Sequence, residues 1–402
     1  LTAQMTWMGA CAGSELLFTR VYEKLVKRPG DPDATVFLMG YDSIPIRAEK
    51  SLYDLAGWCR ARTDVHAHVS NTPTEKLLAE LENDAVPAGV PADDWQALRE
   101  RFQAHMRQFG HIIYDLDFGK ALPLDDPRPM METIKLYLRG EGANPYERQG
   151  SLEARRVAAV EAVLGRVKGL KRWAFRTTLR WAQTLAEIRE DALADIGLGY
   201  PVLRRVLHEL GGRMVARQAI GEPDDVFWLR QEELEQAVKS LEQAGPIPVM
   251  ADRVQERKDS WQRAKAVTPP PVLPPSKRVM GINVEGFVAA DESSHSADTI
   301  RGMGTSAGWV TAPACVLRGP EDFGQMEPGC VLVASITTPA WTPLFAMASA
   351  IVTDVGGPLS HGSIVAREYG IPAVMGTGVA TRRIRSGQTV TVDGAAGTVT
   401  LS

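Results

Sequence analysis

Apolar residues recur at three- and four-residue spacings through most of the first 268 positions. This spacing places them along one side of a helix, and clusters of Gly and Pro separate the successive runs. We therefore predict helices over at least five segments, namely 77–81, 95–108, 152–167, 173–189 and 202–216. The prediction for residues 1–268 is a large all-α domain.

The pattern changes at Thr268, where the segment TPPPVLPPSKR begins and supplies five prolines. Such a run favours an extended, semi-rigid chain. The residues that follow, up to 301, are small, acidic or polar with little apolar periodicity. We predict a Pro-rich linker over 269–301 that could reach on the order of 100 Å when extended. It either tethers a mobile domain or lies across the surface of its neighbour.

From residue 302 to 402 the pattern is typical of strands with a few short helices. Residues 330–334 form a continuous apolar run, and 343–348 predicts a short helix. Alternating residues at 389–392 and 398–401 flank Asp393 and Gly394, which indicates a hairpin. We predict a small α/β domain of about 100 residues, a normal size for one domain. The fold class is thus multidomain α+β.

His361 lies in the segment with the clearest chemistry. A buried strand is predicted to end at 350–352, Gly356 and Gly357 to form a turn, and a helix to run from 363 to 369 before a Gly and a Pro. His361 then sits in or beside the first helical turn. Backbone N–H groups lack partners there, and the helix dipole favours anions.

A neutral imidazole is a competent nucleophile near neutral pH, so His361 could carry a phosphoryl group covalently. The Ser360 hydroxyl would be a further donor to such a group. The alternative for an isolated histidine is that it only caps the helix.

The stretch GGPLSHGSIVAREYGIPAVMGTG resembles the phosphohistidine segment of the phosphoenolpyruvate-utilising enzymes, which include phosphoenolpyruvate synthase, pyruvate phosphate dikinase and the rifampin phosphotransferases. The shared pattern is a Gly pair, a small residue before the histidine, Ala-Arg-Glu, Gly-Ile-Pro-Ala-Val and a closing Gly. The resemblance implies that His361 is the phosphorylated residue, with Gly356, Gly357 and Ser360 around it. It also implies a small swivelling domain.

Three more residues are candidates for the surroundings of the phosphate. The segment TTPAWTPLF resembles a stretch that flanks the phosphate site in this family, so Thr337 and Thr338 could donate to a phosphoryl oxygen. Threonines beside Pro339 are also common in turns. Arg367 could neutralise phosphate charge, or it could be a structural ion-pair partner of Glu368 or of another element.

The segment FGHIIYDLDF, residues 109–118, is the candidate for acceptor binding. An acceptor hydroxyl benefits from a general base within hydrogen-bonding distance, and the candidates are His111, Tyr114, Asp115 and Asp117. The segment is similar to one that lines the acceptor pocket of rifampin phosphotransferases, but Ile112 stands where those enzymes have Arg, so rifampin is not the expected substrate. The alternative is a helix end with a buried histidine and two capping acids.

The resemblance implies a dikinase-type phosphotransferase, similar to phosphoenolpyruvate synthase. In these enzymes ATP phosphorylates the histidine with release of AMP and phosphate, and the histidine swings to the acceptor, which favours a mobile linker. ATP and Mg²⁺ are bound there by an ATP-grasp domain, whereas this sequence shows no glycine-rich phosphate loop. We therefore expect a nucleotide-binding domain or subunit as partner. The chain opens at Leu1 rather than Met, which is expected of a fragment, a processed product or the ordered part of something longer.

We expect the acceptor to be a small organic molecule with a hydroxyl. Two alternatives stay open: a phospho-carrier subunit without an acceptor site of its own, and an ATP-driven ligase of the prodigiosin-condensing type.

Composition excludes several other classes. A net charge of -4 over 402 residues gives no bulk argument for nucleic acid or a membrane. The four cysteines show no metal-ligand spacing, so we predict no metal site and a cytoplasmic location with reduced thiols. Six basic residues between 166 and 180 could in principle contact nucleic acid. We expect them to be a solvated helix face or a docking surface for an acidic domain.

Overall fold

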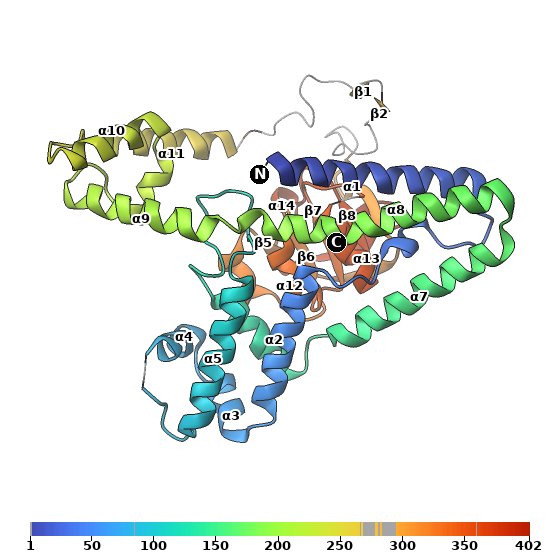
Figure 1. Ribbon diagram of the computed structural model, residues 1–402, viewed down its shortest axis with the longest axis horizontal. Coiled ribbons are helices and arrows are strands. Elements are labelled where there is room, and N and C mark those ends of the chain that lie inside the picture. The colour runs from blue at the N-terminus through green and yellow to red at the C-terminus, as the bar shows by residue number, and fades with distance from the viewer. Residues whose placement is uncertain are drawn as a thin grey trace. The chain divides into compact units, whose positions relative to one another are not determined.

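The computed structural model describes residues 2–83, 85–265, 267, 278–279, 282–283, 295–358 and 360–402. Contacts between residues divide the chain into two compact units (Figure 1). The first unit comprises Leu1–Leu116, Leu122–Ile196 and Lys277–Ser402, and the second Asp117–Ala121 and Gly197–Ser276. Residues 1–196 thus group with the C-terminal domain rather than with the helices up to residue 268. Most of the predicted linker, 269–301, lies outside the described residues.

The first unit contains eight helices among its described residues before position 197. They are α1 (Thr2–Val21), α2 (Ile44–Arg60), α3 (Thr63–Asn71), α4 (Thr74–Glu82), α5 (Ala92–Phe109), α6 (Arg128–Arg139), α7 (Pro145–Arg166) and α8 (Gly169–Ala194). The predicted helices at 77–81, 95–108, 152–167 and 173–189 correspond to α4, α5, α7 and α8. Only residue 167 falls outside, because α7 ends at Arg166. The prediction missed α1, α2, α3 and α6.

Helices α1 and α8 lie side by side (Figure 1), held by a cluster of buried aromatic rings. Phe18 and Phe175 face each other from the two helices with ring centres 5.8 Å apart, and Phe37 completes the cluster. Because each ring buries a large apolar surface, the cluster fixes the register of α8 against α1. This register matters because the last turns of α8 carry charged residues that reach the C-terminal domain.

The C-terminal domain is built on an eight-stranded mixed sheet with strand order β3-β10-β9-β5-β6-β7-β8-β4. Its strands are β3 (Thr299–Arg301), β4 (Met303–Ser306), β5 (Trp309–Leu317), β6 (Val331–Ala334), β7 (Ala350–Thr353), β8 (Ala373–Met375), β9 (Thr389–Asp393) and β10 (Thr398–Leu401). Its helices are α12 (Thr342–Phe345), α13 (His361–Tyr369) and α14 (Ala380–Arg383). Two further short strands, β1 (Arg278–Val279) and β2 (Ile282–Asn283), pair separately.

Strands β5, β6, β7 and β8 run parallel, and this decides where the site lies. In a parallel sheet the loops that follow neighbouring strands meet at the same edge. The loop after β6 carries Thr337 and Thr338 and leads to α12, which begins at Thr342, and the loop after β7 leads into α13. The apolar run predicted at 330–334 corresponds to β6. The hairpin predicted at 389–392 and 398–401 corresponds to β9 and β10. The predicted fold class, a helical region followed by a small α/β domain, is confirmed.

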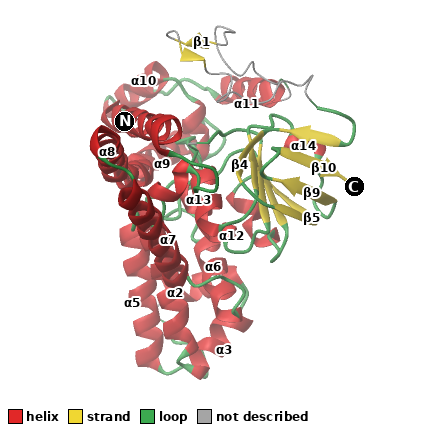
Figure 2. Ribbon diagram, turned by 90° about the vertical axis from the view of Figure 1, so that its right-hand side faces the viewer, coloured by secondary structure: helices red, strands yellow, loops and turns green. Residues whose placement is uncertain are grey.

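The helices of residues 1–196 and the C-terminal sheet share one hydrophobic core. That core joins Leu52, Phe109 and Tyr114 of the helical part to Phe323 and Trp341 of the sheet domain. Figure 2 shows the strands gathered on one side, with α2, α5 and α6 extending away from them. A second core, made largely of Val and Ala residues, fills the opposite face of the sheet.

The second unit has its own small core. It contains α9 (Tyr200–Ala216), α10 (Gln231–Glu242) and α11 (Ala251–Lys265), packed around Met214, Ile220 and Met250. The predicted helix 202–216 lies within α9. Among all described residues, no helix is both long enough and apolar enough to cross a membrane.

Candidate functional site

The start of α13 is shaped by the carbonyl of Gly357. That oxygen accepts from the Ser360 amide at 2.9 Å, from the Ser360 hydroxyl at 2.8 Å and from the Ser363 hydroxyl at 2.7 Å. Gly356 has φ +142°, a conformation that other residues rarely adopt. The first backbone bonds of the helix run from Ser363 and Ile364 to Ser360, so the amides of His361 and Gly362 precede the helical ladder.

His361 is the first residue of α13, and its imidazole is buried with 5% of the residue exposed. Its Nδ1 lies 3.0 Å from Oε2 of Glu190, and its Nε2 lies 3.4 Å from Oγ1 of Thr342. The Thr342 hydroxyl donates to the carbonyl of Pro339 at 2.7 Å. A carboxylate on Nδ1 fixes the proton there, so Nε2 keeps its lone pair.

Glu190 comes from the last turns of α8, in the helical part of the chain. Burial alone would raise the pKa of its carboxyl, but the hydrogen bond with His361 and the positive charges of His361 and Arg189 outweigh burial and lower it. Arg189 lies 3.3 Å from Glu190 and donates to Glu15 of α1 at 2.6 Å. The imidazole therefore faces an ionised carboxylate that is itself held by a buried arginine.

The two candidate threonines have different surroundings. Thr337 is buried beside the first turn of α13, and a methyl group added to Gly362 would lie only 2.6 Å from its Oγ1. Thr338 donates to the carbonyls of Ile113 and Tyr114 at 2.8 and 3.0 Å. Thr337 thus lies at the start of the histidine helix, whereas Thr338 holds a loop of the helical part.

Arg367, in the last turn of α13, is held by two backbone carbonyls. Its guanidinium donates to the carbonyls of Pro358 at 2.9 Å and Thr305 at 3.2 Å, and burial lowers its pKa to about 10. Here it joins the start of α13 to β4. Its neighbour Glu368 has a carboxyl whose pKa rises to about 8, first because of burial and then because of Glu190.

The four acceptor candidates do not converge. Tyr114 is buried, and its ring packs edge-on against Phe323 with centres 5.7 Å apart. His111 lies 3.4 Å from Asp195, and Asp117 accepts from the Gly119 amide at 2.9 Å within the second unit. Asp115 is partly exposed. Among the described residues, none of the four lines either of the two cavities that follow, and their role stays a prediction.

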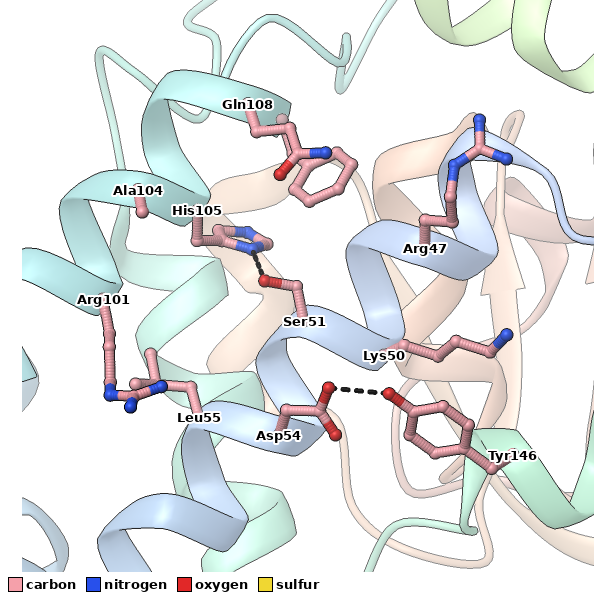
Figure 3. A pocket seen from close by; sticks show the side chains of 11 residues that line it. Arg47, Lys50, Ser51, Asp54, Leu55, Arg101, Ala104, His105, Gln108 and Tyr146 are labelled. Carbon is pink, nitrogen blue, oxygen red and sulfur yellow. Dashed lines mark hydrogen bonds between the residues drawn. The ribbon is translucent and has the colours of Figure 1, made fainter.

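A cavity of about 430 Å³ opens between α2 and α5 (Figure 3). Most of its lining residues have a polar group, although they also present apolar surface, and they come from α2, α5 and the start of α7, with Arg47, Lys50, Asp54, Arg101, His105 and Tyr146 among them. A smaller cavity of about 20 Å³ shares His105 and Phe109 with it and extends to Thr342. The smaller cavity thus reaches Thr342, whose Oγ1 lies 3.4 Å from His361 Nε2, whereas His361 itself lines neither of the two cavities.

Lining residues of the larger cavity are held by local contacts. His105 Nδ1 lies 3.0 Å from the Ser51 hydroxyl, and burial lowers the His105 pKa to about 4. Tyr146 donates to Asp54 at 2.6 Å (Figure 3), and Lys50 lies 2.8 Å from Asp42. His105 is therefore neutral near pH 7. Among the described residues, no group of three or more His, Cys, Asp or Glu side chains is placed to hold a metal ion.

No pattern in the sequence pointed to Glu190 or Glu49 as functional residues, whereas Thr342 lies in the segment TTPAWTPLF. Glu190 and Glu49 come close to α13 only through folding. The one available signal was the charged run Arg189-Glu190-Asp191 inside an otherwise amphipathic helix.

Residues 326–397 match the family described as the PEP-utilising enzyme, mobile domain, and this match includes His361. Residues 6–190 match the rifampicin phosphotransferase fourth domain and so include Glu49 and Glu190. The chain thus contains the mobile domain of the phosphoenolpyruvate-utilising enzymes and a rifampicin phosphotransferase fourth domain. In this structure the contact between His361 and Glu190 connects the parts of the chain covered by the two matches.

Bacterial proteins, two of them phosphotransferases by name, are similar to most of this chain. The chain is 35% identical over 336 residues to an uncharacterized phosphotransferase, YvkC, of Bacillus subtilis, covering 82% of this chain and 39% of that protein. It is 29% identical over 410 residues to a rifampicin phosphotransferase of Streptomyces sviceus, covering 99% and 44%. Chondramide synthase cmdD of Chondromyces crocatus is 33% identical over 389 residues, covering 93% and 10%. The chain spans less than half the length of each.

Proposed function

We propose that this chain receives a phosphoryl group on His361 and transfers it to a small hydroxyl compound bound between α2 and α5. The observation that carries the proposal is the imidazole itself, which has one nitrogen on an ionised carboxylate and the other 3.4 Å from Thr342, a residue that lines the smaller cavity. A histidine that only capped its helix would need neither contact.

Glu190 explains how His361 can both accept and release phosphate. With Nδ1 protonated toward Glu190, the Nε2 lone pair is the nucleophile. Once Nε2 is phosphorylated, the carboxylate stabilises the proton on Nδ1. The ring then leaves as neutral imidazole, a far better leaving group than its anion.

In the transfer step the acceptor oxygen forms a bond to phosphorus while the P–Nε2 bond breaks. The electron pair of that bond returns to Nε2, so the ring leaves as neutral imidazole with its Nδ1 proton toward Glu190. The proton of the acceptor hydroxyl passes to solvent. Positioning and exclusion of water do most of the work, as in other phosphoryl transfers.

Phosphorylation requires His361 to leave this arrangement, because the buried ring has no room beside it for a nucleotide. We propose that residues 302–402 swivel on the 269–301 linker to a site where ATP and Mg²⁺ are bound by an ATP-grasp domain or subunit. Relatives more than twice as long as this chain support that proposal. The described residues offer no metal cluster of their own, and we derive no step through one.

The larger cavity favours an acceptor-binding enzyme over a carrier subunit. A carrier without its own acceptor would not need a cavity that continues toward the histidine. The Arg, Lys and Asp side chains around its mouth favour a polar hydroxyl compound. The buried free thiols are in keeping with a cytoplasmic enzyme.

The first test uses phosphoramidate, a small donor that phosphorylates histidine without ATP. We expect an acid-labile, alkali-stable adduct that mass spectrometry maps to His361 and that is absent from His361→Ala. Incubating the labelled chain with a panel of hydroxyl compounds should then yield a phosphate ester. Adducts at other histidines with none at His361 would overturn the proposal.

A further inference from the structure

A second buried carboxylate lies away from His361, in the helical part. Glu49 of α2 has a fully buried side chain. It accepts from the Tyr137 hydroxyl at 2.8 Å and is bound by both terminal nitrogens of the Arg148 guanidinium. These three residues come from α2, α6 and α7, so the group is complete within residues 1–196. We call it the Glu49 socket.

One residue of the C-terminal domain enters this socket. The Tyr369 hydroxyl donates to Oε1 of Glu49 at 2.6 Å, and the Arg148 guanidinium carbon lies 3.7 Å from the centre of the Tyr369 ring. The socket thus contacts both the polar and the aromatic part of one side chain. Hydrogen bonds to charged groups and cation–π contacts are each strongest when shielded from water, as they are here.

The socket does not depend on Tyr369 for its own stability. A buried carboxylate is costly unless it is paired, and Arg148 with Tyr137 already supplies that pairing. The socket can therefore remain formed when residues 302–402 move away. It offers a preformed place for Tyr369 on return.

Tyr369 and His361 are the two ends of α13, and each end is held by a carboxylate of the helical part. Phe345 packs between them, with ring centres 6.0 Å from Tyr369 and 6.3 Å from His361. One attachment would leave the helix free to rotate about it. Two attachments fix both its position and its direction.

We infer that Tyr369 is a positioning residue for transfer, whose entry into the Glu49 socket holds α13 so that His361 Nε2 faces Thr342 beside the smaller cavity. This inference rests on the proposed function. It adds that docking of residues 302–402 depends on a second contact, between Tyr369 and Glu49, at the opposite end of α13 from His361.

The test uses the burial of His361 as its readout. In the docked arrangement the ring is shielded, so phosphoramidate labels it only in molecules that have undocked. Tyr369→Phe removes the hydroxyl and keeps the ring. We expect it to raise the rate of His361 labelling about tenfold, the factor for losing a hydrogen bond to a charged group. Discharge of the labelled chain to an accepted hydroxyl compound should slow.

Tyr22→Phe is the matched control. It removes a tyrosine hydroxyl bonded to the Pro32 carbonyl at 2.7 Å, remote from α13, and should leave labelling unchanged. Glu49→Gln should raise the rate, and adding Tyr369→Phe to it should have little further effect. Equal rates in the parent chain and Tyr369→Phe would overturn the inference alone. No adduct at His361 in any variant would overturn the proposed function as well.

Discussion

His361 Nδ1 lies 3.0 Å from Glu190 Oε2, although 171 residues separate them in the sequence. One belongs to the part that matches the mobile domain and the other to the end of the part that matches the rifampicin phosphotransferase fourth domain. The histidine therefore gains its carboxylate only when the two parts meet. Because this pairing is conditional, the two half-reactions should respond differently to loss of Glu190.

Glu190→Gln should slow discharge of phosphorylated His361 while leaving its phosphorylation at a separate ATP site unaffected. The amide oxygen can still accept from Nδ1–H but carries no negative charge to stabilise the protonated phosphoimidazole, so P–N cleavage loses about 10²-fold in rate, the usual contribution of such a group. Rapid-quench measurement of the acid-labile adduct would follow discharge, and its pH optimum should move downward. Glu209→Gln, on an exposed ion pair with Arg213, is the control. Equal slowing of both half-reactions would contradict the conditional role.

Docking should weaken as pH rises. In the docked arrangement the pKa of Glu368 is raised to about 8 from an ordinary 4.5, first by burial and then by the charge of Glu190. Glu49 acts in the same direction, whereas Arg148 and Arg189 oppose it. A carboxyl with a raised pKa binds a proton on docking. Its favourable contribution is complete below pH 4.5, declines above it and is lost as pH passes through 8.

Fluorescence energy transfer can measure that dependence. Dyes on cysteines placed at the exposed positions Gln103 and Arg385 would report the docked fraction, and the four native cysteines are buried. The docked fraction should fall between pH 5 and 8 in the parent chain and change little in Glu368→Gln. The same slope in both chains would show that another group titrates.

Gly362→Ala should disturb the phosphate site. Its methyl group would lie 2.6 Å from Thr337 Oγ1, so the threonine or the helix must move. We expect a loss of about 1–3 kcal/mol in unfolding free energy, as for other overpacked sites. Gly165→Ala, where nothing lies within 4 Å on α7, should instead be neutral or stabilise by up to about 1 kcal/mol. Denaturant unfolding checks both, and matching values would refute the steric argument.

Thr338→Val should shift the chain toward the undocked state. The isosteric change leaves the carbonyls of Ile113 and Tyr114 without the threonine hydroxyl, at a cost of about 1–3 kcal/mol. The dye pair at positions 103 and 385 would detect a lower docked fraction. Thr311→Val, which removes an exposed contact with Thr391 between two strands, should not change it. An unaltered docked fraction in Thr338→Val would mean that this loop does not hold the domain.

Local patterns predicted much of the fold. Helices α4, α5, α7 and α8 have apolar residues in register with the helical period, and the β9–β10 hairpin has an alternating pattern around Asp393. Helix α1 was missed because its apolar residues are mixed with small ones along its whole length, so no stripe stands out. Helix α13 was predicted from 363 to 369 and begins two residues earlier, at His361. Its end was predicted correctly because Gly370, at φ +67°, ends it.

The candidate site was only half accessible from the sequence. His361, Gly356, Gly357 and Ser360 are neighbours in the chain, so a motif could gather them. Glu190 and Glu49 become site residues only because α2 and α8 pack against α13. The motif also gathered Arg367, as a phosphate neighbour or a structural partner, and in this structure its guanidinium donates to the carbonyls of Pro358 and Thr305.

All residues that line the larger cavity belong to α2, α5 and α7, and none comes from the histidine-bearing domain. An acceptor can therefore load while that domain is elsewhere being charged. The order in which the two substrates arrive is then free, and the return of a charged histidine, rather than acceptor entry, becomes the event that commits a turnover.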